Sequence, residues 1–303
     1  MLRWIRRLAL ALAGLALSLL LVACGLHVAN SGDGTLPPRG EALRVATLNV
    51  HYIRLNAAQG DWSVADWERR KGPLDLAFNE LGPALMAFQE MESFGRGDTS
   101  GVNLTLDWLL ERNPGHRAAA TGDPAEFPST QPILYRAERL ELLDQGWYFF
   151  SDTPEVIYSR TFNGSWPAFA TWARFRDRET GTAFRAVNVH FEYRSGSNRL
   201  LSAALVRDRT RPWVDAGEPV ILLGDINALH GSPTMERLEE AGLDFLPVEG
   251  STYHFNRGVN LFGAIDHVAV TAGIGATDPV VLRRQFDGEW PTDHYPVVAD
   301  LTF

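Results

Sequence analysis

In the stretch Val220-Ile221-Leu222-Leu223-Gly224-Asp225-Ile226-Asn227, an apolar run ends in a glycine and polar residues. Four consecutive apolar residues are typical of a strand that is buried on both faces. On its own, Gly224-Asp225-Ile226-Asn227 is also an ordinary turn sequence, in which Asp and Asn bond to their own backbone. Other strands that end in the same way would favour a site over a turn.

Other apolar runs also lead into Asn, Asp, Glu or His. The polar ends are Asn49, Gln89-Glu90, Asn188-Val189-His190, Asp266-His267 and Thr292-Asp293-His294. Strand ends on a rigid sandwich can bring several side chains to one point. Taken singly, His190 could be a hydrogen-bonded core histidine and Asp293 a turn residue. Glu90 is the hardest to explain in this way, since a carboxylate is rarely buried without a partner or a metal.

The chain from Leu43 onward shows no internal repeat and reads as one folded unit. Short β-rich runs predict strands over Arg44–Val50, Ala84–Phe88, Pro132–Tyr135, Thr171–Arg176, Phe184–His190, Pro219–Leu223, Ile265–Val270 and Pro296–Thr302. Apolar residues at three- and four-residue spacing predict helices over Trp67–Leu76, Leu104–Glu111, Leu200–Asp215 and Thr234–Ala241. Because several strands follow one another without a crossover helix, two packed sheets with helices outside are favoured over an alternating parallel sheet.

The composition narrows the chemistry. With 303 residues, 45% hydrophobic and 21% charged, the chain is neither disordered nor a multispan membrane protein. Its single cysteine excludes a disulfide framework or a cysteine-rich zinc site, so a metal would be held by carboxylates, Asn or His. Without the three arginines of residues 1–23, 25 basic and 37 acidic residues leave a net charge of −12. Such a charge disfavours, without excluding, a nucleic-acid substrate.

The N-terminus has the pattern of an export signal. Residues 1–7 are basic, residues 8–22 are apolar, and Leu21-Val22-Ala23-Cys24 resembles the lipobox of bacterial lipoproteins. We therefore expect residues 1–23 to be a signal peptide and Cys24 to be lipidated, which would anchor the exported protein to the bacterial cell envelope. Gly25 after the cysteine favours the outer membrane over the inner one. The alternative is an uncleaved hydrophobic anchor that contains an ordinary cysteine.

Residues 24–43 are rich in Gly, Ser, Asn and Pro and lack a hydrophobic period, which predicts a flexible tether before a catalytic domain over 44–303. Within that domain, Gly and aromatic residues in Tyr253–Phe262 predict a loop at the rim of the site. Trp147-Tyr148-Phe149-Phe150 is the nearest candidate for a membrane-inserting hairpin. It is better explained as a buried strand.

The order of the polar strand ends resembles that of the endonuclease/exonuclease/phosphatase superfamily, over about Leu43 to Phe303. These metal-dependent phosphoesterases include DNase I-like nucleases, neutral sphingomyelinases and inositol polyphosphate 5-phosphatases. Phe150–Pro154 and Asn188–Phe191 are most similar to a bacterial group without settled substrates. The resemblance implies an α/β (α+β) fold, a DNase I-like four-layer sandwich of two mixed β-sheets flanked by helices, with the site at one edge of the sheets.

The resemblance also implies residue roles. Glu90 would be the principal ligand of Mg²⁺ (or Mn²⁺), with Asn49 and Asp293 in or beside its coordination shell. Asp225 would position or deprotonate the attacking water, Asn227 would hold a phosphate oxygen and His190 would face the same phosphate. His294 would contact the scissile phosphate and Asp266 would orient its imidazole. Asp266-His267 is a rival Asp-His pair, which we rank second because Pro296 and the following strand complete the pattern after His294.

The substrate is left open among three alternatives. The first is a phosphodiesterase or nuclease, the second a phosphomonoesterase on sugar or inositol phosphates, and the third a catalytically silent binding module. The third is disfavoured because no signature residue is missing. Arg160, Arg194 and Arg199 are candidates for substrate binding, although they could be solvated loop charges. We expect a monomer that binds a phosphoester, either a nucleic acid or a small organophosphate.

Overall fold

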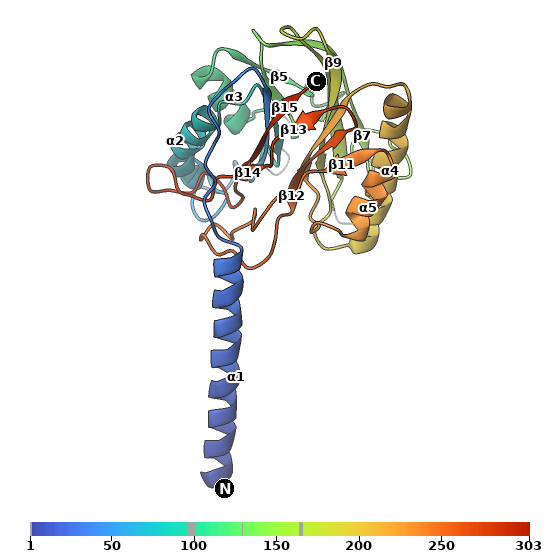
Figure 1. Ribbon diagram of the computed structural model, residues 1–303. Coiled ribbons are helices and arrows are strands. Elements are labelled where there is room, and N and C mark those ends of the chain that lie inside the picture. Colours follow the sequence, from blue (N-terminus) through green and yellow to red (C-terminus); the bar gives the residue numbers. More distant parts are fainter. Residues whose placement is uncertain (1, 96–100, 129, 164–165) are drawn as a thin grey trace.

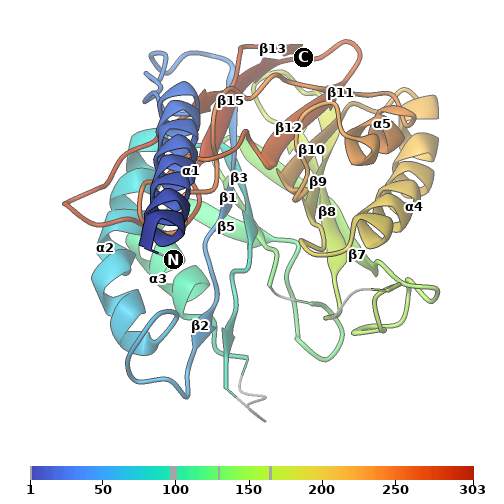
Figure 2. The ribbon, with the colours of Figure 1, turned by 90° about the horizontal axis from the view of Figure 1, so that it is seen from below.

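Two β-sheets face each other in the computed structural model, with a pair of helices against the outer face of each sheet (Figure 1, Figure 2). The structure describes all residues except 1, 96–100, 129 and 164–165. The helices are α1 (Leu2–Ala29), α2 (Val64–Leu81), α3 (Leu104–Arg112), α4 (Gly196–Asp215) and α5 (Pro233–Glu239). The predicted four-layer α/β sandwich is confirmed.

Both sheets are mixed. The first has the order β13 (Gly275–Ala276), β15 (Val297–Thr302), β1 (Leu43–Asn49), β3 (Leu85–Gln89), β6 (Ile133–Arg136) and β5 (His116–Ala119), and β14 (Val280–Val281) also pairs with β15. The second has the order β11 (Leu243–Phe245), β12 (Asp266–Thr271), β10 (Val220–Asp225), β9 (Ala183–His190), β8 (Phe169–Asp177) and β7 (Leu140–Phe149). A small separate pair joins β2 (Ile53–Arg54) to β4 (Ser93–Phe94). Only β1 with β3 and β9 with β10 run parallel within the two large sheets as described.

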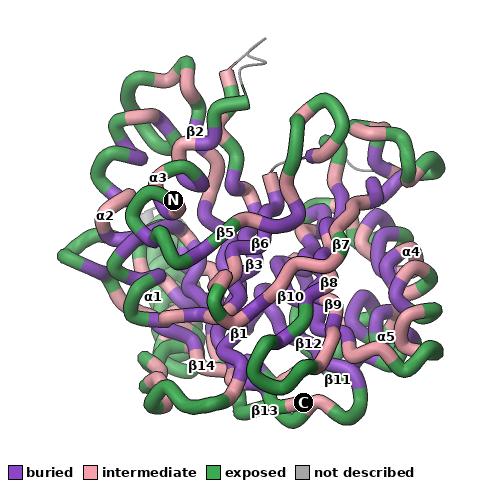
Figure 3. The backbone as a smooth tube through the Cα atoms, turned by 90° about the horizontal axis from the view of Figure 1, so that it is seen from above, coloured by how far each residue is buried: buried purple, intermediate pink, exposed green. Residues whose placement is uncertain are grey.

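Three hydrophobic layers separate the four structural layers. Successive residues of β10 show why: Ile221 and Leu223 pack between the sheets, whereas Val220 and Leu222 pack toward α4 and α5. A third cluster lies between the first sheet and the helices α2 and α3. Figure 3 shows that the buried residues concentrate in the strands. The central strands are buried on both faces, which explains their continuous apolar runs.

All eight predicted strands and all four predicted helices are present, with shifted ends. The helix α2 begins earlier than predicted because the Ser63 hydroxyl caps it, accepting a hydrogen bond from the backbone N–H of Asp66. It ends at Gly82, whose φ of 56° favours glycine. The stretch Trp147–Phe150 is a strand end with Tyr148, Phe149 and Phe150 buried, as the sequence indicates.

The helix α1 is exposed and extends away from the domain (Figure 1). Its residues Arg3–Ala29 are the one described segment that is long and apolar enough to cross a membrane, and a signal sequence near an N-terminus has the same character. Cys24 lies within α1 as a free, exposed thiol. The apolar N-terminal helix therefore agrees with an export signal.

Residues 30–42 lie against the domain, which differs from the predicted flexible tether. The carbonyl of Asn30 accepts a hydrogen bond from Ser251 N, and the Asp33 carboxylate accepts one from Arg283 N at 2.9 Å. Farther along, Arg39 donates to the carbonyl of Asn79, and Leu36 packs against the outer core of the first sheet. The segment thus has fixed contacts along one flank of the sandwich.

Candidate active site

The strand register brings the predicted site residues to one edge of the sandwich. Asp225 of β10 is paired with His190 on parallel β9 and with Asp266 on antiparallel β12. In the other sheet, Asn49 at the end of β1 is paired with Gln89 at the end of β3. We call this end of the sandwich the site edge. It is formed by the C-terminal ends of β1, β3, β9 and β10 and by the starts of β12 and β15.

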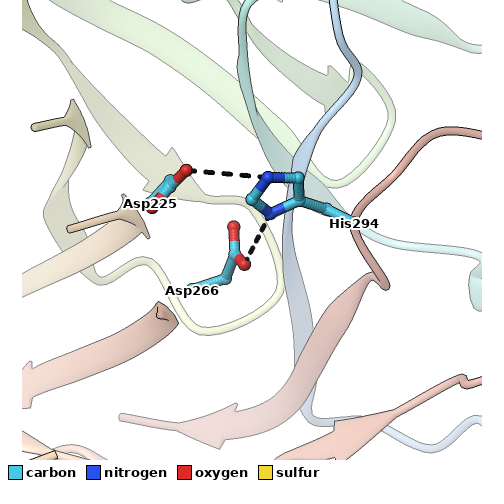
Figure 4. A group of neighbouring side chains, drawn as sticks. All are labelled: Asp225, Asp266 and His294. Carbon is cyan, nitrogen blue, oxygen red and sulfur yellow. Dashed lines mark hydrogen bonds and ion pairs between the residues drawn. The ribbon is translucent and has the colours of Figure 1, made fainter. Parts of the chain in front are cut away.

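A hydrogen-bonded carboxylate–imidazole pair lies at the base of the site (Figure 4). Nδ1 of His294 is 2.8 Å from Oδ2 of Asp266, and its Nε2 is 3.9 Å from Oδ2 of Asp225. Burial lowers the pKa of His294, but the charge and hydrogen bond of Asp266 outweigh burial and raise this pKa to about 10. The buried imidazole is therefore cationic at neutral pH and directs Nε2 toward Asp225.

The rival pair of Asp266 and His267 does not form. His267 follows Asp266 on the same strand, and successive side chains of a strand point to opposite faces. Its Nε2 lies 3.0 Å from the carbonyl oxygen of Ala228, and its ring packs edge-on against Phe245 in the core under α5. Burial lowers the pKa of His267 to about 4, so this imidazole is neutral.

Asp225 lies between two imidazoles. Its Oδ2 is 3.8 Å from Nε2 of His190, 3.9 Å from Nε2 of His294, and accepts a 3.3 Å hydrogen bond from Nδ2 of Asn49. Burial and then the charge of Asp266 raise the pKa of Asp225 to about 6, against the opposing effect of the two histidines. A carboxylate with this pKa can accept a proton near neutral pH.

Glu90, Asn49 and Asp293 offer hard oxygen atoms beside this group. Nδ2 of Asn49 donates to Oε1 of Glu90 at 3.1 Å. The Thr292 hydroxyl lies within hydrogen-bond distance of two acceptors, the backbone carbonyl of Asn49 at 2.9 Å and Oδ1 of Asp293 at 3.2 Å. Burial raises the pKa of Asp293, but nearby histidines, His51 first, bring it below its ordinary value. Oxygen donors from two carboxylates and an amide fit a divalent cation such as Mg²⁺.

Asp225, Asp266 and His294 also place possible metal-ligand atoms within 4.8 Å of one another. This group is better explained as a hydrogen-bonded relay than as a metal centre. Nδ1 of His294 and Oδ2 of Asp266 are already bonded to each other at 2.8 Å, so neither atom is free to bind an ion. We therefore favour Glu90, Asn49 and Asp293 as the metal ligands.

The Gly224-Asp225-Ile226-Asn227 turn is shaped by the neighbouring strand. Gly224 has a φ of 145°, and a Cβ there would collide with the carbonyl oxygen of Val189. The Asn227 backbone N–H then donates to Oδ1 of Asp225 at 2.9 Å, which fixes the carboxylate. One N–H of the Asn227 side chain donates to the Phe191 carbonyl, which leaves the second amide N–H for a ligand.

Two of the motif residues are structural. Nε2 of Gln89 donates to Oδ1 of Asn188 at 2.7 Å, and Nδ2 of Asn188 donates to the Phe88 carbonyl at 2.8 Å. Both side chains are buried and join the two sheets directly beneath the site. This connection fixes the separation between Glu90 and His190, which lie one and two residues farther along their strands.

Arg70 is a buried contributor that the sequence analysis did not single out. From α2 it donates to the carbonyl oxygens of Val50 at 2.7 Å, His51 at 3.0 Å and Pro291 at 3.2 Å. These carbonyls belong to the loops that follow Asn49 and precede Asp293. The guanidinium therefore connects the loop after Asn49 to the loop before Asp293 on the side of α2. A lone arginine in a predicted surface helix carries no sequence signal of this kind.

A cavity of about 430 Å³ opens beside Asp293. Its walls combine aromatic residues with polar ones, and they include Trp62, Tyr253, Phe255, Asp61, Asn256 and Arg257. The backbone is left-handed at His51, Trp62, Phe255 and Asn256, with φ between 54° and 67°, and also at Asn227, with a φ of 49°. Left-handed backbone is unfavourable for such bulky residues and clusters where a ligand site requires it. Tyr253 also packs against His294, with ring centroids 5.0 Å apart.

The three predicted substrate-binding arginines lie on segments of the site edge but differ in their surroundings. Arg199 lines a second cavity with Asn227, and it donates to the carbonyls of Glu192 and Tyr193. Arg194 is exposed and stacks over Tyr193, and Arg160 is exposed. The described contacts join none of the three to Asp225 or His294, so their role stays a prediction.

Comparisons with known proteins agree with this geometry. The sequence model described as Endonuclease/Exonuclease/phosphatase family matches residues 46–294, which span every predicted metal and catalytic residue. No curated protein gives a significant match. The match covers most of the chain and stops short of α1.

Solved structures share the fold at low sequence identity. A mannosyl-6-phosphatase from Bacteroides thetaiotaomicron is 21% identical with a TM-score of 0.72, covering 86% of this chain and 100% of its own. An endonuclease/exonuclease/phosphatase from Bacteroides vulgatus is 22% identical with a TM-score of 0.72, covering 87% of this chain and 100% of its own. TDP2 from D. rerio, complexed with a single-strand DNA product, is 13% identical with a TM-score of 0.62, covering 87% and 100%. At these identities the likeness shows the fold alone.

Proposed function

The chain belongs to the endonuclease/exonuclease/phosphatase family, and we propose that it hydrolyses phosphoester bonds with the help of a divalent metal ion. One observation carries the proposal: Asp225, with a pKa of about 6, lies 3.8 Å and 3.9 Å from the imidazoles of His190 and His294. Phosphoester hydrolysis requires a group that takes a proton from water and positive charge facing the phosphoryl oxygens. Both are provided here by side chains of the chain itself.

Asn49, Glu90 and Asp293 would hold the ion, Mg²⁺ or Mn²⁺. When bound, the ion supplies neutralisation of the phosphate charge and stabilisation of the leaving oxygen. Asn49 has a second task, because its amide donates to both Glu90 and Asp225. It thereby keeps the base at a fixed position relative to the principal metal ligand.

The remaining residues act on the phosphate and the water. Asp225 takes the proton of the attacking water. His294, held cationic by Asp266, donates from Nε2 to a phosphate oxygen. His190 faces the same phosphate from β9, and the free amide N–H of Asn227 donates to another oxygen. Asp266 acts through His294 and is a positioning residue.

A phosphodiester is the first candidate substrate, and the aromatic walls of the cavity beside Asp293 favour a planar base next to the scissile phosphate. The same cavity supports a second candidate, a phosphomonoester of a sugar or inositol. An apolar ring face and a few polar groups, here Asp61, Asn256 and Arg257, are typical of small-ligand sites. A mannosyl-6-phosphatase among the relatives supports it further.

Hydrolysis rates of the purified full chain test the function. The panel is plasmid DNA, RNA, bis-p-nitrophenyl phosphate, sphingomyelin and sugar and inositol phosphates, each with Mg²⁺ and with EDTA. We expect metal-dependent hydrolysis of a diester; faster hydrolysis of a monoester would favour the second candidate. A chain that binds these esters but hydrolyses none of them would be a silent binding module and would contradict the proposal.

The cellular location is also part of the proposal. Cys24 would carry the acyl chains of an exported lipoprotein and would anchor the domain to the bacterial cell envelope, at the outer membrane rather than the inner one. Its sole-cysteine position after Leu21-Val22-Ala23 and the apolar helix around it support this assignment. Several acyl chains anchor a protein stably, whereas a single chain does not.

A further inference from the structure

Exposed apolar side chains of the domain gather at the site edge. They are Trp62, Phe94, Val102, Val156, Tyr158, Trp166, Tyr193, Leu200, Leu201, Leu229 and Phe255. They lie on the segments that follow strand ends at the site edge or lead back into that edge, including the short strand β4 for Phe94, or in the first turns of α4 for Leu200 and Leu201. Outside α1, Leu76 is the one other large apolar side chain that is exposed among the described residues. Clustered apolar exposure marks an interaction surface.

The end of α1 reaches the same edge. Nδ1 of His27 accepts a 3.0 Å hydrogen bond from Asn260 N, and Nδ2 of Asn260 donates to the Ser31 hydroxyl at 2.8 Å. Asn260 belongs to the loop between β11 and β12, whose residues Tyr253 and Phe255 line the cavity beside Asp293. Thus a single loop separates the end of α1 from the active site.

The path of residues 30–42 brings α1 to this edge. The strand β1 begins at Leu43, at the opposite end of the sandwich, because Asn49 is the residue at the site edge. From α1 the chain passes Val281 at Gly34 and the C-terminal part of α2 at Arg39, and only then enters β1. A chain that only needed to tether the domain could leave directly from Leu43. Instead it returns along the domain and places its apolar helix beside the active site.

We propose that the site edge is a membrane-contact surface, on which the domain rests against the bilayer that holds its N-terminus. The occupant is a lipid bilayer, because the apolar helix α1, whose last turn contains His27, is continuous with this surface. Lipidation at Cys24 gives the same orientation, since Cys24 is only three residues before His27. Trp166 and Tyr193, which are 79% and 61% exposed, are residue types that settle at the membrane–water interface.

Quenching of tryptophan fluorescence by brominated phosphatidylcholine tests the surface in the full chain reconstituted into liposomes. The variant is Trp166→Phe, and the matched control is Trp213→Phe, in the last turn of α4 at the opposite end of the domain. We expect Trp166→Phe to lower the lipid-quenchable fluorescence and Trp213→Phe to leave it unchanged. Trp4 in α1 contributes equally to every chain. An unchanged quenchable signal in Trp166→Phe would overturn the proposal.

Hydrogen exchange of the full chain in nanodiscs provides a second measurement. The reference sample is the full chain kept in solution by amphipol, without lipid. We expect residues 191–195 at the site edge to exchange more slowly in nanodiscs than in this reference sample. Residues 178–182, in the turn at the opposite edge, should exchange equally in both. Equal exchange at both edges would contradict a membrane-contact surface. Because neither measurement involves catalysis, failure here would leave the proposed phosphoesterase intact.

Discussion

Nδ1 of His294 lies 2.8 Å from Oδ2 of Asp266, and both side chains are buried. The pair holds a cationic imidazole at the base of the site, with Nε2 directed toward Asp225. A neutral imidazole bonded to water instead would not provide a fixed positive charge at this position. The charge of Asp266 is therefore expected to act on the reaction through His294.

Asp266→Asn and His294→Ala should each lower kcat strongly, and the double variant should be little slower than the slower single variant. Residues that act as a unit give non-additive effects. The measurement is a double-mutant cycle in kcat/KM, with melting temperatures recorded on the same samples. Additive losses would contradict the pairing.

His267→Gln is the matched control for this cycle. His267 is adjacent in sequence but points into the core under α5, where a Gln can still donate to the Ala228 carbonyl. We expect its kcat to stay near that of the wild type. A loss as large as that of His294→Ala would favour the rival Asp266-His267 pair.

Arg70→Lys should destabilise the protein and slow the reaction. A lysine keeps the charge but cannot reach the carbonyls of Val50, His51 and Pro291 together. Each buried carbonyl left unpaired costs roughly 1–3 kcal/mol. Chemical denaturation and kcat measure the two effects. Arg69→Lys is the control, because that neighbouring side chain is 56% exposed; equal behaviour of the two variants would show that Arg70 does not hold the site.

Much of the fold could be predicted because the central strands are buried on both faces and end in polar residues. The strand β7 was missed except at its end, since it is an edge strand whose register shifts between Leu142 and Asp144. The short strands β5 and β11 carry too few residues for a period. Strand ends and their shared register explain why Asn49, Asp225 and Asp266 lie at the same edge of the sandwich.

Other parts of the site depend on contacts that no local pattern encodes. Arg70 reaches three backbone carbonyls through the tertiary path of two loops, and His27 meets Asn260 across more than two hundred residues of sequence. Strand alternation requires Asp266 and His267 to face opposite ways, but only the packing decides which one faces the site. The Gly, Ser and Pro composition of residues 24–43 likewise conceals their contacts with the domain.

Stability should fall as the pH decreases from 6.5 toward 4, in part because of His267. Burial lowers the pKa of His267 from 6.5 to about 4. Between these values the unfolded chain binds a proton that the folded chain does not, so the free energy of unfolding falls by up to about 1.4 kcal/mol per pH unit. Above pH 6.5 the His267 imidazole is neutral in both the folded and the unfolded chain, so it no longer makes the free energy of unfolding depend on pH. Denaturation at pH 7 and pH 5 should show a smaller fall for His267→Gln; an identical fall would contradict the burial effect.

Cys24→Ser should abolish labelling with palmitate and leave the precursor unprocessed by the lipoprotein signal peptidase. The prediction depends on the lipobox-like Leu21-Val22-Ala23-Cys24 and on the absence of another cysteine in the sequence. Labelling in cells that express the full chain measures it. A variant that still incorporates palmitate would refute lipidation at this residue.

Glu90→Gln should raise the Mg²⁺ concentration needed for activity and lower the rate at saturating metal. The amide preserves the size of the side chain but removes the negative charge that faces the ion. A Mg²⁺ titration of the rate measures both effects, with melting temperatures to check the fold. An unaltered metal requirement would exclude Glu90 as the principal ligand.

The role of Asp225 as the base in metal-dependent hydrolysis is tested by comparing the wild type with Asp225→Asn. The substrate is bis-p-nitrophenyl phosphate, or whichever ester of the panel reacts fastest. Asn matches the shape of Asp225 but cannot take a proton from water. We expect a Mg²⁺-dependent wild-type rate that EDTA abolishes, and a rate lower by about 10²-fold or more in a folded Asp225→Asn variant. Wild-type hydrolysis by that variant, or full activity in EDTA, would contradict it.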